Sequence, residues 1–390
     1  MGSRQDNHYY MLLRTAPFRQ LLLRYSACHL SAGAAYLLLI AAAASAHQSP
    51  WIASLVAGAY GLGFAVMCGG WPTVSSRLGQ RRALFWCGAC CSIMLVVFTT
   101  VAPERSAAPL LGTLAWSVGL TTPPLAAIVR SRWAALVSDA RLVVPAFTLH
   151  GSLLAAFAVA NPLLVASTAT LLGVASSSYL CAACLFLGVS ALASTRTEAS
   201  DQGVPKRGTS ATASRQPATL AIYGVLFLIY AAYGDLEVAC VRGFPTGGYS
   251  ILLSGWAIGG ITGATVLGLR RRTDASWRRA RLLLVAAAAV LLSGAPAWPN
   301  IWWLAAVLFF FGCTGTPGVS LIFALVSDAA GTTDAAPVYS RISAVTWIGN
   351  AAGAALLANT GPDRVIAVAG VSASFLLLFG AAGLWRRRAD

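Results

Sequence analysis

The sequence predicts an all-α polytopic membrane protein with twelve transmembrane helices in two six-helix bundles. Three observations support this fold class. Hydrophobic residues make up 57% of the 390 residues, charged residues only 10%, and the mean hydropathy is +0.71. A soluble domain of this length does not need so much apolar surface, whereas a chain that crosses a membrane many times does. The other two observations are a single long polar segment near the middle of the chain and a repeat on either side of it.

The two flanks of the polar segment resemble each other at a constant offset of 194 residues. This shift places Tyr36 on Tyr230 and Arg77 on Arg271. It also matches Gly61 with Gly255, Gly69 with Gly263, and Thr122-Pro123 with Thr316-Pro317. Residues 194–217 are too rich in Ser, Thr and Gly to bury a core, so we interpret them as a cytoplasmic linker. The expected domains are an N-terminal bundle over 1–193 and a C-terminal bundle over 218–390.

Twelve segments satisfy the length that a membrane requires. A hydrocarbon core about 30 Å thick needs roughly 20 apolar residues per helix. Six segments precede the linker: Phe18–Ala46, Trp51–Pro72, Ala83–Ala102, Ala108–Val129, Val143–Ala166 and Thr170–Ala193. Six follow it: Ala218–Val241, Tyr249–Leu269, Leu282–Ala297, Ile301–Val326, Val338–Leu357 and Val365–Trp385.

The basic residues set the expected orientation. A net charge of +15 is compatible with nucleic-acid binding, but the distribution of the charge favours a membrane topology. With the N-terminus in the cytoplasm, all but three of the 27 Lys and Arg lie in or beside cytoplasmic segments, the exceptions being Arg105, Arg242 and Arg364. We therefore expect a multi-pass protein of the cell (inner) membrane, with both termini cytoplasmic, its basic clusters near lipid headgroups, and no nucleic-acid partner.

The cysteines and the search for enzyme motifs give no indication of catalysis or metal binding. Most of the nine cysteines lie within apolar segments without His or carboxylate neighbours, so we expect buried thiols, no disulfide and no metal site. The sequence has no phosphate-binding loop of the Walker type, no HExxH and no G-x-S-x-G. We expect neither an enzyme nor a cofactor.

The first segment presents one polar and aromatic face. Tyr25, His29, Gly33 and Tyr36 recur at roughly helical spacing. His29 lies about ten residues from the cytoplasmic end, which at a rise of about 1.5 Å per residue places it near the middle of the membrane. Intramembrane ionisable groups tend to face a cavity, so His29 is a candidate for proton coupling, and a hydrogen bond between helices is the alternative.

The stretch Pro72–Arg82 follows the second segment, and we expect it to form a loop. It resembles the short glycine- and arginine-containing signature of major facilitator superfamily transporters. The matching residues are Arg77, Gly79, Arg81 and Arg82. Ser76 replaces the aspartate that helps to latch the two halves in that family. Twelve segments, a central linker and a repeat extend the resemblance over nearly the whole chain, and it implies alternating access by rocking of the two halves.

The fourth segment ends with Thr122-Pro123-Pro124, followed by Arg130-Ser131-Arg132-Trp133. Because prolines remove backbone donors, we expect a kink here and a broken or flexible helix at the matching Pro317 of the tenth segment. The ending "PP…R-x-R-W" resembles a subgroup of bacterial facilitator proteins that export drugs or natural products. The string from Tyr233 to Val238 resembles them as well.

The fifth segment contains His150, Asn161 and Pro162. Proton-coupled exporters of the superfamily carry glycines and a Gly-Pro pair at this place. Pro162 is retained, whereas Asn161 stands where the second glycine would be, so the resemblance implies the fold more strongly than antiport. His150 lies near the cytoplasmic face, where a cavity position and a packing position are both open.

The seventh segment holds two carboxyl groups, Asp235 and Glu237. Tyr230, Tyr233 and Glu237 fall at i, i+3 and i+7 and so form one stripe, whereas Asp235 points roughly the other way. Apolar surroundings favour the neutral form of a carboxyl group, and a proton carrier needs this property. A hydrated residue at the outer mouth is the alternative for Glu237. In the eleventh segment, Trp347 and Asn350 are candidates for contact with a substrate, and a hydrogen bond to a neighbouring helix is the alternative for Asn350.

These patterns predict a secondary active transporter that exports a small drug-like or natural-product compound, with protons as the coupling ion. The proton-coupling candidates are Glu237, His29 and Asp235. The substrate-cavity candidates are Tyr25, Tyr36, His150, Asn161, Tyr230, Tyr233, Trp347 and Asn350. The expected partners are a small-molecule substrate, the lipid bilayer and protons, and the expected state is a monomer. The alternatives are a nutrient importer or uniporter, and a non-transporting receptor or scaffold.

Overall fold

The computed structural model describes residues 8–46, 50–102, 107–136, 140–194, 217–244, 248–269, 276–294, 300–330, 335–356 and 365–383. Every regular element in these ranges is an α-helix. The helices before the linker are α1 (His8–Arg14), α2 (Ala16–Ala46), α3 (Pro50–Leu78), α4 (Gln80–Val101), α5 (Ala108–Thr121), α6 (Leu125–Leu136), α7 (Ala140–Leu172) and α8 (Val174–Ala193). Those after it are α10 (Pro217–Gly243), α11 (Gly248–Leu269), α12 (Trp277–Gly294), α13 (Ile301–Ala330), α14 (Ala335–Leu356) and α15 (Val365–Gly383). Most of the predicted linker lies outside the described residues.

Within the described ranges, nine helices are long and apolar enough to cross a membrane. Lipid offers no hydrogen-bond partners, so an apolar stretch satisfies its backbone groups internally and becomes a helix. The three remaining predicted segments also form helices, α12, α14 and α15. α12 has three arginines among its first five residues, and the apolar stretch of α15, Ala367–Ala382, is shorter than 18 residues.

The loop expected over Pro72–Arg82 is wrong in its extent. Helix α3 continues through Pro72 as far as Leu78, and α4 begins at Gln80, so the turn consists of Gly79. Its φ of +77° lies in the left-handed region, where a side chain would crowd the following carbonyl oxygen. Gly79 of the matched signature therefore allows a backbone conformation that other residues rarely adopt. A single residue reverses the chain between two membrane-spanning helices.

Replacing Gly79 is expected to destabilise this turn. Gly79→Ala would place a Cβ in the left-handed region, at a cost of about 1–2 kcal/mol. The apparent melting temperature of the detergent-solubilised protein should fall. Gly69→Ala is the matched control, because Gly69 lies within α3 and no atom lies within 4 Å of an added Cβ there. Equal melting temperatures for the two variants would contradict this account of the turn.

Two matched proline sites behave differently. The fourth predicted segment is interrupted, because α5 ends at Thr121 and Thr122 adopts an extended backbone (φ −70°, ψ 120°). Each of the successive prolines 123 and 124 lacks an N–H and disfavours the helical conformation of the residue before it. The expected kink is thus a complete break between α5 and α6. At Pro317 a broken or flexible helix was expected, and the break is absent, since α13 runs through Pro317 without interruption. A single proline removes one donor and leaves the rest of the helix intact.

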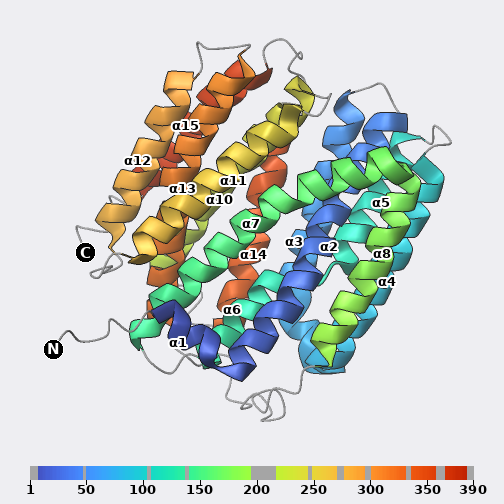
Figure 1. The fold of residues 1–390 in the computed structure, drawn as a ribbon, viewed down its shortest axis with the longest axis horizontal. Helices are drawn as coiled ribbons and strands as arrows, with labels where there is room; N and C mark the ends of the chain where they lie inside the picture. Colours follow the sequence, from blue (N-terminus) through green and yellow to red (C-terminus); the bar gives the residue numbers. More distant parts are fainter. Residues whose placement is uncertain are drawn as a thin grey trace.

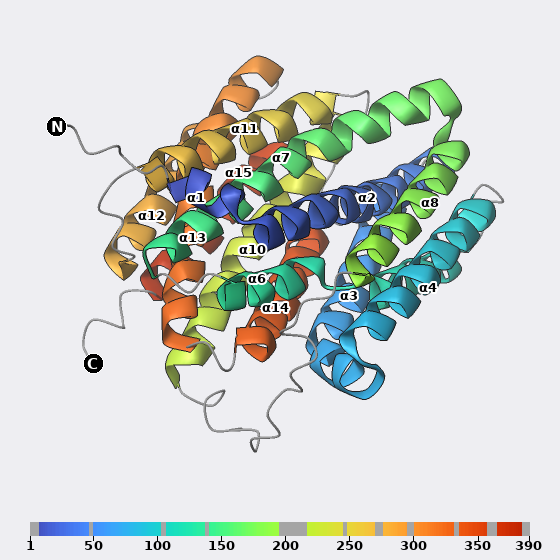
Figure 2. The ribbon, with the colours of Figure 1, turned by 60° about the horizontal axis from the view of Figure 1, so that its bottom comes forward.

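The buried apolar side chains form two clusters. The first draws on α1–α8, and the second on α10–α15 together with Ala127 of α6. The two groups of helices lie side by side, with α4, α5 and α8 at one end of the molecule and α12, α13 and α15 at the other (Figure 1). They meet where α3 packs against α14 and α7 packs against α11. Figure 2 shows α6 and α14 between the two groups. Side chains on these middle helices can therefore contact both groups.

Glycines allow several helix pairs to approach closely. A Cβ added at Gly259 would overlap the carbonyl oxygen of Phe309, and one added at Gly353 would overlap that of Ala231. The first pair joins α11 to α13, and the second joins α14 to α10. Apolar side chains gain little by leaving lipid for a helix interface, so close backbone packing of small residues holds such helices together.

Candidate functional site

A histidine cluster, defined here as Tyr25, His29, His150, Trp133 and Phe157, joins α2, α6 and α7. The hydroxyl of Tyr25 and Nε2 of His150 are 3.0 Å apart and hydrogen-bonded, and both side chains are buried. His29 packs on Tyr25, with ring centroids 5.1 Å apart, and on Phe157 at 5.3 Å. The ring of Trp133 meets that of His150 edge-on at 5.2 Å. The structure thus brings three predicted site residues together. The Nδ1 atom of His29 is buried and has no partner among the described residues.

Asn161 packs against the helix that carries His29. Its amide nitrogen occupies the space that a Cβ of Gly33 would fill. Gly33 on the predicted face of α2 therefore makes room for an amide from α7. The oxygen Oδ1 of Asn161 is buried and has no hydrogen-bond partner among the described residues.

An aromatic cluster of Tyr36, Tyr60, Phe64 and Trp347 links the two groups of helices. Tyr36 lies on α2, Tyr60 and Phe64 on α3, and Trp347 on α14. The Trp347 ring lies edge-on to all three partners, at 5.9, 5.9 and 5.0 Å respectively. Two predicted residues, Tyr36 and Trp347, thus meet across the boundary between the groups. Edge-to-face pairs of this kind contribute about 0.5–1.5 kcal/mol each beyond the area they bury.

Glu237 lies beside this cluster and lines a small cavity, called here the Glu237 cavity. The cavity encloses about 20 Å³, enough for about one water molecule. Its wall is built by three helices, α2, α3 and α10, and consists of Tyr36, Leu37, Ile40, Ala53, Ser54, Ala57, Glu237, Val238 and Arg242. The amide of Asn350 on α14 donates a hydrogen bond to the Glu237 carboxylate. The structure thus gathers Tyr36, Glu237 and Asn350 at one place.

The stripe predicted on the seventh segment divides between two environments. Tyr230 and Tyr233 contact each other at 5.4 Å, and Tyr233 packs edge-on against Trp256 at 5.0 Å and Phe311 at 5.7 Å. The Tyr233 ring therefore faces α11 and α13, whereas Glu237 faces the Glu237 cavity.

Asp235 points away from Glu237, into the helices after the linker. Its carboxylate accepts a hydrogen bond from the hydroxyl of Ser372 on α15, and its side chain is fully buried. The second oxygen, Oδ1, has no partner among the described residues. Asp235 lies outside the group formed by Tyr36, Glu237 and Asn350.

The matched signature residues lie at the surface. Arg77, Arg81 and Arg82 are exposed, and the hydroxyl of Ser76 donates to the carbonyl of Thr73 within its own helix. A different polar contact joins α3 to α14. The buried hydroxyl of Ser340 donates a hydrogen bond to the carbonyl oxygen of Cys68.

Arg130 is the residue that sequence reasoning noted only as part of a string and did not select as a site residue. It lies on α6, is 6% exposed, and its guanidinium carbon lies 4.1 Å from the centroid of the Phe323 ring on α13. No hydrogen bond or ion pair joins it to another described residue. A cation–π contact away from water contributes about 2 kcal/mol. Burial of an unpaired ion costs several kcal/mol, so the contact with Phe323 does not offset the cost of burying Arg130. Arg130 directly follows the predicted segment Ala108–Val129, so its local pattern is that of a cation at the end of a membrane helix and does not identify it as a site residue.

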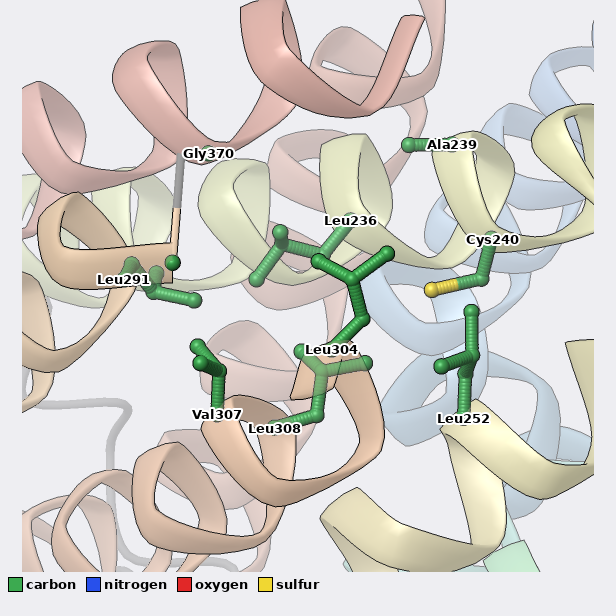
Figure 3. A pocket seen from close by; sticks show the side chains of 10 residues that line it. Leu236, Ala239, Cys240, Leu252, Leu291, Leu304, Val307, Leu308 and Gly370 are labelled. Atoms are coloured by element: carbon green, nitrogen blue, oxygen red, sulfur yellow. The ribbon is translucent and has the colours of Figure 1, made fainter. Parts of the chain in front are cut away.

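A second cavity, of about 30 Å³, lies entirely among the helices after the linker. Figure 3 shows its apolar lining, which includes Leu236 and Cys240 of α10, Leu252 of α11 and Leu304 of α13. With no charged or hydroxyl-bearing side chain on this wall, it offers no chemistry for recognising a polar ligand. The Glu237 cavity is therefore the stronger candidate.

Comparison with solved structures identifies the fold. The chain resembles the crystal structure of the human organic anion transporter MFSD10 (TETRAN), with a TM-score of 0.70 at 14% sequence identity. The match covers 95% of this chain and 100% of that one. The two chains therefore share a fold over nearly their whole lengths. No protein-family model and no curated protein sequence matches the chain.

This similarity and the nine apolar helices of the described ranges confirm that the chain is an all-α, multi-pass membrane protein. The expected arrangement of twelve helices in two six-helix bundles stays a prediction. The resemblance to bacterial exporters stays a prediction, as do the roles of the individual site residues.

Proposed function

We propose that this protein is a secondary active transporter of the major facilitator type. Twelve transmembrane helices form two six-helix halves that rock about a central cavity and export a small organic compound in exchange for protons. Glu237 carries the proton, and His29 is the next candidate. The substrate contacts side chains along the boundary between the halves, of which Tyr36, Trp347 and Asn350 are the central ones.

The observation that carries this proposal is the position of Glu237. A carboxyl group on α10 shares a cavity with α2 and α3 of the other group of helices and is hydrogen-bonded to Asn350 of α14. Rocking of one half against the other would change the access of water to this cavity, so the carboxyl group could exchange a proton with one side at a time. The name of MFSD10 supports organic anions as the first class of compound to test.

Cellular accumulation of a fluorescent aromatic carboxylate, fluorescein, tests the direction of transport. Cells that produce the protein are loaded with the dye and compared with cells that carry an empty vector. Export predicts a lower steady-state fluorescence, which should rise when a protonophore dissipates the proton gradient. Higher fluorescence would indicate import or uniport, and equal fluorescence with and without the protein would favour a receptor or scaffold.

The proposed orientation makes a separate prediction. A reporter that is active only in the cytoplasm, inserted within residues 194–217, should be active, because the Lys/Arg asymmetry places this segment inside. The same reporter fused within residues 103–106, between α4 and α5, should be inactive. The opposite pair of results would reverse the assignment of every loop.

A further inference from the structure

Arg130 lies among groups from both halves of the molecule. Phe323 of α13 supports the guanidinium from one side. The positive charge also lies close enough to act on Tyr25, His29 and His150 of the N-terminal helices and on Tyr230 of α10. Each of these four side chains can form hydrogen bonds. The surroundings of Arg130 therefore contain hydrogen-bonding partners for a ligand but no paired anion among the described residues.

The repeat places this arrangement near the centre of the protein. The 194-residue offset matches Arg130 with Ala324, the neighbour of Phe323. Two nearly equivalent positions that touch each other must lie close to the axis that relates the repeats. Arg130 and Phe323 are such a pair, since Arg130 directly follows the fourth segment, Phe323 lies in the matched tenth segment, and the two side chains contact each other. The interface between the two repeats is where an alternating-access transporter holds its substrate.

We propose that Arg130 binds the acidic group of the transported compound, a carboxylate, sulfonate or phosphate attached to an apolar body. This assignment rests on the proposed transport function and adds the residue that recognises the acidic group of the substrate. Stacking on Phe323 occupies one face of the guanidinium and leaves the N–H groups at its edge free to donate, which suits a planar, two-oxygen acceptor. The unpartnered Nδ1 of His29 and the Tyr230 hydroxyl are available for the same group. Phe157 and Trp133 of the histidine cluster would contact the apolar body.

Matched pairs of ligands test the preference for an acidic group. Purified full-length protein in detergent is incubated with 2-naphthoate or its neutral amide, 2-naphthamide, and with naphthalene-2-sulfonate or naphthalene-2-sulfonamide. Thermal stabilisation gives the relative affinities without any proton gradient. The wild-type protein is expected to bind each anion at least about tenfold more tightly than its neutral partner. The proposal would be overturned if both members of every pair stabilised the protein equally, or if neither member stabilised it.

Three variants assign the preference to Arg130. Arg130→Met should bind anion and amide alike, Arg130→Lys should retain part of the preference, and Arg132→Gln, on the same helix, should retain all of it. A preference that survives Arg130→Met would overturn the assignment. If Arg130→Met does not fold, Arg130→Lys becomes the test. Lysine lacks the planar, forked N–H groups of the guanidinium, so the preference for carboxylate and sulfonate must fall if Arg130 binds them.

The same acidic chemistry is present in lipid headgroups. Naphthoate binding is therefore repeated in vesicles of phosphatidylcholine alone and in vesicles that contain phosphatidylglycerol. A soluble anion as substrate predicts equal binding in both, whereas competition by phosphatidylglycerol would identify a lipid as the ligand and would overturn the soluble substrate class. These measurements are made at equilibrium and do not depend on a proton gradient. A failure of anion binding at Arg130 can therefore be distinguished from a failure of proton-coupled export.

Discussion

Glu237→Gln is expected to abolish accumulation of substrate driven by an imposed pH gradient while leaving exchange of substrate across the membrane intact. Glutamine keeps the shape of the side chain and can still form a hydrogen bond with Asn350, but it cannot release or accept a proton. In proteoliposomes with a pH difference across the membrane, uptake of fluorescein by the variant should fall to the level of protein-free vesicles. With labelled dye on one side, unlabelled dye on the other and no gradient, exchange should match that of the wild-type protein.

Asp235→Asn is the matched control for this experiment. Asp235 lies two residues from Glu237 on the same helix, but its carboxylate is buried against Ser372 on α15 and away from the Glu237 cavity. Asparagine retains an oxygen that can accept the hydroxyl of Ser372, so transport driven by the gradient should persist. Normal gradient-driven transport by Glu237→Gln would show that Glu237 is not the coupling residue, and His29 would be tested next.

Gly353→Ala is expected to cause a large loss of folded protein and of activity together. The added methyl group would overlap the carbonyl oxygen of Ala231, so α14 would have to move away from α10. Overpacking at such an interface costs about 1–3 kcal/mol. The same movement would separate Asn350 on α14 from Glu237 on α10. The yield of monodisperse protein after solubilisation and its melting temperature measure the first effect, and transport per folded molecule measures the second.

Gly58→Ala controls for the change from glycine to alanine in a membrane helix. Gly58 lies on α3, and an added Cβ there has no atom within 4 Å. This variant should keep the wild-type melting temperature or exceed it slightly, because alanine favours the helix. If Gly353→Ala were as stable and as active as Gly58→Ala, the close contact between α10 and α14 would not contribute to the fold.

The class of protein follows from the sequence because it depends on composition and local order. Long apolar segments must be helical in lipid, whatever their neighbours are. The interruption at prolines 123 and 124 was predictable for the same reason, since missing donors and backbone crowding act within a few residues. The turn at Gly79 was only partly predictable. Its glycine was visible in the matched signature, but the continuation of α3 through Pro72 to Leu78 was not.

The partners of the polar side chains were decided by the tertiary structure. Helical spacing places Tyr230, Tyr233 and Glu237 on one stripe, yet Tyr233 packs against Phe311 whereas Glu237 is hydrogen-bonded to Asn350. The tenth segment likewise remains one helix at Pro317, where local rules predicted a break.

Arg130 shows why sequence reasoning reaches a limit. An arginine at the end of an apolar segment has the same local pattern whether it extends to a lipid headgroup or turns inward. Only the tertiary fold, which brings Phe323 from the other half of the chain to α6, places the guanidinium over that ring and buries it. The sequence determines that the chain forms helices in a membrane, because that requirement is local. Which partner each charged group meets depends on contacts between residues more than 100 positions apart, and such contacts exist only once the helices have packed.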